Sequence, residues 1–437
     1  MLLVYTHKIT PRVRYIFTHI FKHVLGVEVG FTSTLENFVA HPEEKMSYTT
    51  APLGKEFFIK SHPLLFEQGL QDVSCELSEW EEMPIFFQQA PPSALPFDLF
   101  AASFYLLTRY EEHLPYVEKD FEGFPVESSL AYRHKFLDTP LVDLWINQLK
   151  SSFLAVYPDV FNQEERKDEK PKVLVDVVQA FKYKHKSIFR NLVQWIKAVF
   201  NLNLWEAIEH PLVLLRLRQD PWGDFTALLP DFFASKKAKP LFFFFQFTEV
   251  SFKDQGITKN EKYLHYLIKA TADYCNVSVL VSQAGRKSLK DFQKERIDFQ
   301  EHIHHPVRHV RFTQNLRNIN ESYKILAAEE IHEDYSMGYP NELGYRASTA
   351  IPFYFFDLAN DYETALLLHP VVATENWVRK KTPQKAIAII EKLHQKRRFP
   401  QAETNLSVTH KIFEKSIHNA PYSTAFNAYI CGEDGTA

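Results

Sequence analysis

Residues 260–283 read NEKYLHYLIKATADYCNVSVLVSQ, and the hydrophobic period changes part-way along this stretch. Leu264, Leu267 and Ile268 fall on one face at three- and four-residue steps, which predicts an amphipathic helix. From Val277 the residues VSVLV form a short β-branched run, which predicts a buried strand. A helix that passes directly into a buried strand is the unit from which parallel β/α sheets are built.

The same alternation continues on both sides of this stretch. Short apolar runs that predict strands are VLVDV at 173–177, LFFFFQF at 241–247, HVRF at 309–312 and ALLLHPVV at 365–372. Amphipathic patterns predict helices over 288–303 and 382–396, the second with Thr382 as N-cap and Pro383 at the first helical position. Strands separated by helices in this rhythm predict an α/β protein with a parallel sheet or a (β/α) barrel.

A polar, densely charged segment, FNQEERKDEKPK at 161–172, divides the chain into two parts. Before this segment, the pattern predicts a strand at 2–7, a helix at 12–26 and a second strand at 27–33. A further helical stretch is predicted over 96–115. We therefore expect an N-terminal mixed α/β domain over residues 1–165 and a distorted (β/α) barrel over residues 172–430.

The composition argues against several classes of function. A net charge of −4 without a dense block of Lys and Arg gives no footprint for nucleic acid. Glycine is scarce, at 12 of 437 residues, and no phosphate-binding glycine motif occurs. Cys75, Cys275 and Cys431 are too far apart for a disulfide framework or a paired-cysteine zinc site. These features fit a reducing compartment.

No apolar stretch reaches the roughly 18 residues of a membrane-spanning helix. The first residues, MLLVYTHKITPRVRYIF, lack the long apolar region of a secretory signal. We therefore expect a cytoplasmic location and no membrane span.

Two polar residues follow or interrupt predicted strands at positions where β/α folds carry their chemistry. Asp176 closes the first strand of the second part, and His369 stands at the end of ALLLHP. In parallel β/α folds the reactive groups lie at the carboxyl ends of the strands. The alternative interpretation is that Asp176 caps a local turn and that His369 is a surface histidine with ordinary partners.

Four long phrases carry a resemblance to a known family. They are the opening MLLVYTHKITPR, the stretch PFDLFAASFYLLTRYEEHLP, the phrase EDYSMGYPNELGYRASTAIPFYFFDL and the strand ALLLHPVV. Together they resemble a Bacteroidetes group of polysaccharide-deacetylase family proteins. The resemblance implies a distorted (β/α) barrel in which one Asp and two His hold a divalent metal, usually zinc. A second Asp acts as general base on the metal-bound water.

Carried over by position, the resemblance places the general base at Asp176 but leaves the metal ligands missing. Val178 stands where the family has its metal-binding Asp, and Ser282 or Gln283 stands where it has a His. None of these is a customary zinc ligand. We therefore expect no cofactor, and Asp176 is expected to be a relic general base beside an empty metal site.

The later motifs of the family are kept in part. Arg346 lies in the retained stretch Tyr345 to Thr349 and could orient Asp176 by a bidentate contact. His369 is retained with Pro370 and Glu375. The family's late histidine falls on Ala402 in one register and on His418 in another, and the first keeps the following Asn-Leu-Ser match.

Two other groups of residues are candidates for binding. The stretch EHIHHPVRHVRF contains His302, His304, His305 and His309, and could hold a replacement metal, although Pro306 interrupts the pair His305 and His309. His309 with Arg311 resembles a strand-end pair of the family and is more naturally structural or ligand-facing. Asp334, Tyr335 and Tyr339 fit a loop that contacts a sugar, and a polar loop without a ligand fits equally well. Glu333 and Asp334 are adjacent, so on an extended chain they point to opposite sides.

Three hypotheses follow. The first is a pseudoenzyme that keeps a cleft for a glycan or a protein partner, with relic roles for Asp176, Arg346 and His369. The second is an active deacetylase of N-acetylated sugars that binds metal through His369 and a histidine from 302–309. The third is a scaffold whose N-terminal domain mediates assembly. An N-acetylated glycan is the expected partner of the first two.

Overall fold

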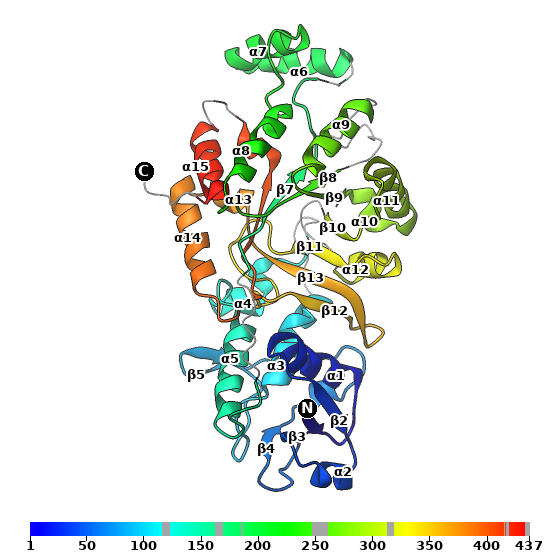
Figure 1. Cartoon of the computed structure of the whole chain (residues 1–437), viewed down its shortest axis with the longest axis vertical. Helices are drawn as coiled ribbons and strands as arrows, with labels where there is room; N and C mark the ends of the chain where they lie inside the picture. Colours follow the sequence, from blue (N-terminus) through cyan, green and yellow to red (C-terminus); the bar gives the residue numbers. More distant parts are fainter. Residues whose placement is uncertain are drawn as a thin grey trace.

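The computed structural model describes residues 1–115, 123–161, 169–184, 186, 188–246, 261–312, 319–414, 416 and 419–432. The chain forms a four-stranded sheet near its N-terminus and a larger sheet that closes on itself (Figure 1). The N-terminal part is drawn in blue to cyan, and the closed sheet with its helices in green to red.

The N-terminal sheet is parallel throughout. Its strands are β1 (Leu2–Tyr5), β2 (Val29–Thr32), β3 (Lys45–Thr49) and β4 (Phe57–Lys60), in the order β2-β1-β3-β4. A separate antiparallel pair is formed by β5 (Ser78–Trp80) and β6 (Met83–Ile85). The predicted mixed α/β character of this part is confirmed.

Five helices accompany this sheet: α1 (Pro11–Phe17), α2 (Leu35–Ala40), α3 (Leu99–Leu107), α4 (Leu130–Arg133) and α5 (Leu141–Leu154). The hydroxyl of Thr10 accepts a hydrogen bond from the backbone N–H of Val13, and Pro11 occupies the first turn, so α1 begins where the sequence predicts. A π-helical segment, Thr18–Val24, continues α1. All nine residues of α3 are buried, which explains why its sequence is apolar on every side.

The second part is a closed barrel of seven parallel strands. These strands are β7 (Val173–Val177), β8 (Leu241–Phe245), β9 (Asn276–Val281), β10 (His309–Phe312), β11 (Glu333–Met337), β13 (Tyr362–Thr374) and β14 (Asn405–Thr409). The barrel closes because β13 pairs in parallel with both β11 and β14, and β14 pairs in parallel with β7. One further strand, β12 (Phe353–Asp357), runs antiparallel along β13. The predicted (β/α) barrel is therefore confirmed.

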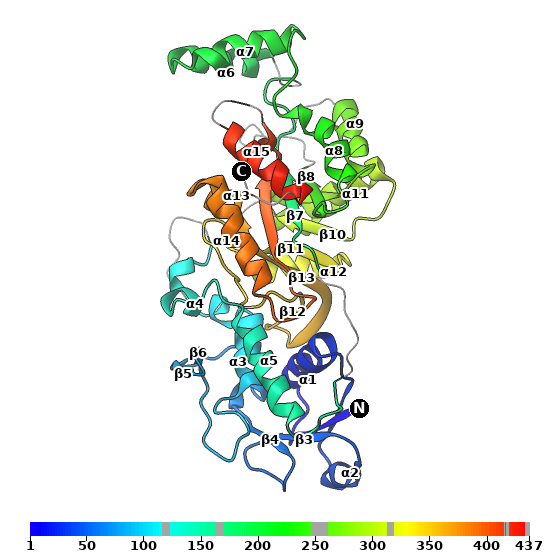
Figure 2. The same ribbon diagram turned by 60° about the vertical axis from the view of Figure 1, so that its left-hand side comes forward.

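Helices surround the barrel (Figure 2). They are α8 (Leu229–Ala234), α9 (Glu261–Ala272), α10 (Gln283–Lys287), α11 (Leu289–Ile303), α12 (Ile319–Ala328), α13 (Glu375–Arg379), α14 (Pro383–Gln395) and α15 (Ala420–Cys431). Helices α9 and α11 pack against β9, and α12 packs against β12 and β13. Thr382 is the N-cap of α14 and Pro383 its first residue, as predicted.

Two more helices lie between β7 and β8 in the sequence. They are α6 (Ile188–Phe200) and α7 (Leu204–Leu214), which form a hairpin. Figures 1 and 2 show this hairpin standing apart from the barrel, at the end of the molecule opposite β1 to β4. The alternation of helical and strand-like hydrophobic patterns along the sequence did not predict this hairpin.

The interior of the barrel is a small apolar core of its own. Its fully buried members alternate along the strands with residues that face the helices, as strand geometry requires; they are Leu174, Phe244, Leu280, Tyr335 and Val371. The barrel is therefore filled by side chains in its middle layer. Polar groups are left to its two ends.

One interpretation of the sequence is wrong. Residues 333–337 form β11 rather than a loop, because their alternating side chains face the barrel and α12 in turn. Cys275 lies outside α9, directly before β9. It is a free, half-buried cysteine, as are Cys75 and Cys431. Among the described residues no helix is long and apolar enough to cross a membrane.

Candidate functional site

The carboxyl ends of the barrel strands bring a carboxylate and a guanidinium together. Nε of Arg311, in β10, donates to both oxygens of Asp176, in β7, at 2.8 and 3.1 Å. Nη2 of Arg311 donates to the hydroxyl of Ser407, in β14, at 2.6 Å, and Nη1 donates to the backbone oxygen of Tyr335, in β11. One side chain therefore joins four strands across the barrel.

The Asp176 and Arg311 side chains are 13% and 8% exposed. Burial raises the pKa of Asp176, and the charge and hydrogen bonds of Arg311 oppose that rise. The hydroxyl of Ser407 lies 3.4 Å from Asp176 Oδ2. With both oxygens of Asp176 engaged by a fixed cation, the carboxylate is held as half of an ion pair. A carboxylate has about four lone-pair sites, so Arg311 fixes the orientation of Asp176 and leaves other lone pairs able to accept hydrogen bonds.

A pocket of about 110 Å³ opens beside this pair. Its walls combine hydroxyl groups with paired charges; the polar lining residues are Asp176, Arg311, Ser336, Thr374, Glu375, Asn376, Ser407 and Thr409. Glu375 accepts from the backbone N–H and the hydroxyl of Thr409, both at 2.7 Å, and pairs with Arg379. Because each charge in the wall has a partner of opposite sign, the pocket suits a neutral ligand that forms hydrogen bonds.

A larger hollow of about 320 Å³ lies beneath the α6–α7 hairpin. It is lined by Trp222, His410 and Glu414 among others. Burial lowers the pKa of His410 to about 4, so this histidine is neutral near pH 7. No strand of the barrel contributes a carboxylate to this hollow, and we assign the candidate site to the pocket at Asp176.

The positions that would hold the metal of a polysaccharide deacetylase do not fit one. Val178 packs against the apolar interior of the barrel. The hydroxyl of Ser282 caps α10 by accepting from the N–H groups of Ala284 and Gly285 at 3.1 and 3.2 Å, and it donates to Glu295. Within the described ranges, no group of three or more His, Cys, Asp and Glu side chains is arranged to hold a metal ion.

His369 does not join Asp176. It lies inside β13, which continues through Pro370 to Thr374, so the strand does not end where ALLLHP ends. His369 contacts Glu403, before the first residue of β14, whereas Asp176 pairs with Thr409, the last residue of that strand. The length of β14 therefore separates the two residues, and the prediction that both stand at the carboxyl mouth is wrong.

At the amino end of the barrel, His369 belongs to a buried charge network. Its Nδ1 lies 2.9 Å from Glu403 Oε2, and its Nε2 lies 3.6 Å from Glu333 Oε2. Lys172 pairs with the other oxygen of Glu403. Burial lowers the pKa of His369, but Glu403 and Glu333 outweigh this effect and the net pKa is raised. The network holds the buried imidazole of His369 between two carboxylates.

Two predicted binding residues lie near this network. The ring of Tyr335 stacks on that of His369 with centroids 4.1 Å apart, and its hydroxyl donates to Glu333 at 2.9 Å. His309 lies on the far side of Tyr335, with ring centroids 6.4 Å apart, and burial lowers its pKa. Both therefore line the amino end of the barrel, away from the pocket at Asp176.

Asp334 faces away from the barrel interior, and it is fully buried in a strand. It accepts hydrogen bonds from the hydroxyl of Tyr323, in α12, at 3.0 Å, and from the backbone and hydroxyl of Ser336 at 2.9 and 2.7 Å. Its prediction as a sugar contact is therefore contradicted. Its neighbour Glu333 faces the barrel, as the alternation of an extended chain requires.

Arg346 does not orient Asp176. It forms a bidentate pair with Glu112, Nε to Oε1 at 2.9 Å and Nη2 to Oε2 at 2.6 Å. Glu112 comes from the N-terminal part, so Arg346 ties the two parts together. Tyr339 lies between the regions: it lines the pocket, and its hydroxyl accepts from Arg109 Nη2 at 3.2 Å.

The remaining candidates are Ala402, His418, His302 and His304. Ala402 is fully buried in the core. His418 lies outside the described residues, so the choice between the two registers stays open. Nδ1 of His302 lies 2.7 Å from the carbonyl of Asp298 within α11, and His304 ends that helix in the left-handed conformation.

Comparisons with known proteins give little beyond this geometry. Residues 2–158 match a family model described as a family of unknown function, DUF7033. The chain has no significant match among curated proteins. A solved structure from Mycobacterium smegmatis described as a "putative polysaccharide deacetylase" matches with 14% identity over 62% of this chain and 87% of that chain, with a TM-score of 0.36. Similarity at this level carries no argument about activity.

Sequence reasoning missed the residues that decide the state of the site. Ser407 and Glu112 were not chosen as functional, and Arg311, in the short strand-like run HVRF, was noted only as the companion of His309. A charged residue inside a buried strand needs a buried partner. That signal was present, but it does not say which of the distant carboxylates is the partner.

Proposed function

We propose that this protein is a polysaccharide-deacetylase-like protein that binds a neutral glycan at the carboxyl mouth of its barrel without metal-dependent hydrolysis. The observation that carries the proposal is the chemistry of the residues at the expected metal positions. The two oxygens of Asp176 face Arg311, and the expected metal positions are Val178 in the apolar core and Ser282 bound to Glu295. Because neither Val178 nor Ser282 is a customary zinc ligand, these positions cannot supply the activated water that a deacetylase needs, and Asp176 is left to shape a binding pocket.

The walls of the pocket support a carbohydrate ligand. Hydroxyl groups of Ser336, Thr374 and Ser407 line it with balanced charges, which is the chemistry that matches a polyhydroxylated neutral molecule. The pocket is smaller than the roughly 300–1,000 Å³ of most small-molecule sites. We therefore expect part of one sugar unit to enter it and the rest of the glycan to lie across the mouth.

The proposal includes three finer points from the sequence: the first follows from the family resemblance, and the other two follow from composition and charge pattern. The ligand is an N-acetylated glycan, the location is cytoplasmic, and the chain divides into an N-terminal domain over 1–165 and a barrel domain over 172–430. The continuous core that joins the N-terminal sheet to the outer wall of the barrel indicates that the two domains act as one body.

Titration calorimetry with a tetramer of N-acetylglucosamine tests the binding. Asn376 is exposed at the rim of the pocket, so Asn376→Trp should block entry and weaken binding by about tenfold or more. Asn37→Trp, at an equally exposed position on α2, should bind as the wild type does. If the wild-type protein shows no saturable binding, glycan binding is ruled out and the scaffold hypothesis remains.

Hydrolysis is tested separately by measuring acetate release from the same tetramer with added zinc. We expect none above a blank without protein. Release that a chelator abolishes and zinc restores would overturn the non-hydrolytic proposal, and it would favour an active metal-dependent deacetylase.

A further inference from the structure

The hairpin of α6 and α7 carries its apolar side chains on the outside. In α6, Ile188, Phe189, Leu192, Trp195, Ile196, Val199 and Phe200 are all exposed, and they recur at three- and four-residue steps along one face. Phe189 is 67% exposed and Phe200 is 83% exposed. The opposite face is polar and turned inward: Asn191 is buried and lies 3.1 Å from His210 of α7. This arrangement is the reverse of an ordinary surface helix.

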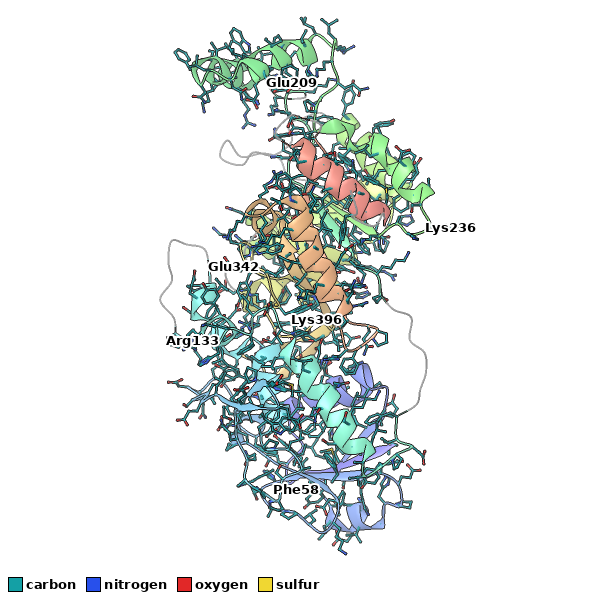
Figure 3. All side chains as sticks on the ribbon, turned by 90° about the vertical axis from the view of Figure 1, so that its left-hand side faces the viewer. Phe58, Arg133, Glu209, Lys236, Glu342 and Lys396 are labelled. Carbon is teal, nitrogen blue, oxygen red and sulfur yellow. The ribbon has the colours of Figure 1, made fainter. Side chains whose placement is uncertain are left out.

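The second helix has the same inversion. In α7, Leu204, Trp205, Ile208 and Leu214 are exposed, while Glu209 and His210 are buried. Among the described residues, 14 of the 28 exposed large apolar side chains fall between Ile188 and Leu217. Exposed apolar residues scattered singly need no explanation, but a continuous patch of this kind marks an interaction surface. Figure 3, with Glu209 labelled, shows side chains that project from the hairpin into open space.

The base of the hairpin is fixed to the barrel. Asp220 accepts hydrogen bonds from the backbone N–H groups of Lys182, Tyr183 and Lys184 at 2.9, 2.9 and 3.0 Å. Lys182 lies 3.3 Å from Glu414, which follows β14. The contacts come from the segments that follow the carboxyl ends of β7 and β14. The apolar surface is therefore held on the same side of the barrel as the pocket at Asp176.

The hairpin is also basic. Residues 184–218 contain six Lys and Arg and two Glu, a formal charge of +4 in a chain whose net charge is −4. Both acids are used internally: Glu206 and Glu209 lie 3.3 and 3.6 Å from Lys182. The surface therefore combines Trp, Phe and Leu with an excess of positive charge. Two copies of such a surface would repel each other, whereas an anionic surface would attract it.

We propose that α6 and α7 dock on an anionic phospholipid bilayer. Apolar and aromatic side chains on one face with Lys and Arg around them are the features of helices that lie in the plane of a membrane interface. With 13 and 11 residues, the helices are shorter than the roughly 20 residues that span the hydrocarbon core, so they lie on the bilayer. Docking in this orientation turns the carboxyl mouth of the barrel toward the membrane.

Co-sedimentation of the full chain with lipid vesicles tests the proposal. We expect binding to phosphatidylcholine vesicles that contain about one third phosphatidylglycerol, and binding at least tenfold weaker to phosphatidylcholine alone. The double variant F189S/F200S removes two exposed side chains and should reduce binding by about tenfold or more. Its melting temperature should match the wild type, because neither side chain is buried. Tyr266→Ser, at a 70% exposed position on α9, is the matched control and should bind normally.

Three results would overturn the proposal. One is a wild-type protein that fails to sediment with anionic vesicles. Another is a double variant that binds them as strongly as the wild type. The third is a dimer in analytical ultracentrifugation that F189S/F200S converts to a monomer, which would assign the patch to a second copy of the chain. The vesicles contain no glycan, so these results are independent of the proposed glycan binding.

Discussion

The ion pair of Asp176 and Arg311 shows what single residues contribute to this site. The sequence predicts a carboxylate at the end of a buried strand, and the structure places it there. Its partner lies 135 positions further along the chain. Which basic residue faces Asp176 depends on how the barrel strands pair around the whole ring, and no local pattern encodes this. The incorrect choice of Arg346 follows from that limit.

Replacing Arg311 should show how much stability is lost when Asp176 has no cationic partner. Arg311→Met leaves Asp176 in a largely buried position without compensation, so we expect a loss of about 3–5 kcal/mol in the free energy of unfolding. The double variant Asp176→Leu with Arg311→Met removes both charges and should recover most of that loss. Urea unfolding of the wild type and the two variants measures both effects. A double variant as unstable as the single one would mean that the pair is not the source of the loss.

The histidine at the other end of the barrel gives a pH-dependent contribution to stability. Glu403 and Glu333 raise the pKa of His369 against the effect of burial, and their own pKa values are lowered to about 2. A base with a raised pKa stabilises the fold fully below its ordinary value of 6.5, and this contribution is lost as the pH rises through the folded value. The carboxylates contribute above their ordinary value of 4.5. The network is therefore strongest between these two values.

We expect His369→Gln to reduce the dependence of stability on pH. The difference in unfolding free energy between wild type and variant should be larger near pH 6 than near pH 9, because the contribution of a group with a raised pKa is complete below 6.5 and declines as the pH rises. Urea unfolding at both values measures it, with the exposed His305→Gln as control. Equal differences at the two pH values would show that His369 is not charged in the folded protein.

At the level of elements, hydrophobic period predicts well where a segment is long or clearly periodic. The strand at 309–312 and the helix from Pro383 are found where the pattern places them. Strand β11 was missed because it begins with two adjacent acids, Glu333 and Asp334, and is followed by Gly338 and Pro340, which are turn residues. In α6 the apolar spacing is that of a helix, but only the structure shows that this face points to solvent.

Gly338 ends β11 at a point where no side chain fits. A Cβ atom there would lie 2.4 Å from the carbonyl oxygen of Val371 and 3.0 Å from its Cβ, both in the neighbouring β13. Gly338→Ala should therefore push the two strands apart and cost about 1–3 kcal/mol of stability. Gly54→Ala meets nothing nearer than 3.4 Å and is the control. Thermal unfolding compares them, and an unchanged melting temperature for Gly338→Ala would contradict the tight approach seen here.

On the scale of the whole molecule, the N-terminal part is attached to the barrel by buried charges as well as by apolar packing. Arg12 pairs with Asp361 at 2.8 Å, and Asp143 accepts from the hydroxyl of Thr349 at 2.6 Å. The charged segment at 161–172 predicts a division of the chain. It does not predict these contacts, because their partners are more than 200 positions apart in sequence.

The centre of this attachment is a balanced cluster of two arginines and two glutamates. Arg346 and Arg109 both pair with Glu112, and Arg109 also pairs with Glu111 at 2.8 Å. Burial raises the pKa of Glu112, but Arg346 and Arg109 outweigh it and the pKa falls to about 2. Glu112 is therefore held by Arg109 from its own part and by Arg346 from the barrel, so its pair with Arg346 joins the two parts.

Arg346→Met should therefore destabilise the joint between the two parts. It leaves the cluster with one uncompensated negative charge, and we expect a loss of about 3–5 kcal/mol. The double variant Glu112→Gln with Arg346→Met restores the balance and should recover most of the stability. Urea unfolding followed by circular dichroism and by tryptophan fluorescence measures both, and the wild type should give coincident curves because one core joins the parts. If Arg346 instead supported Asp176 directly, neutralising Glu112 would restore nothing, because the missing contact would lie in the barrel.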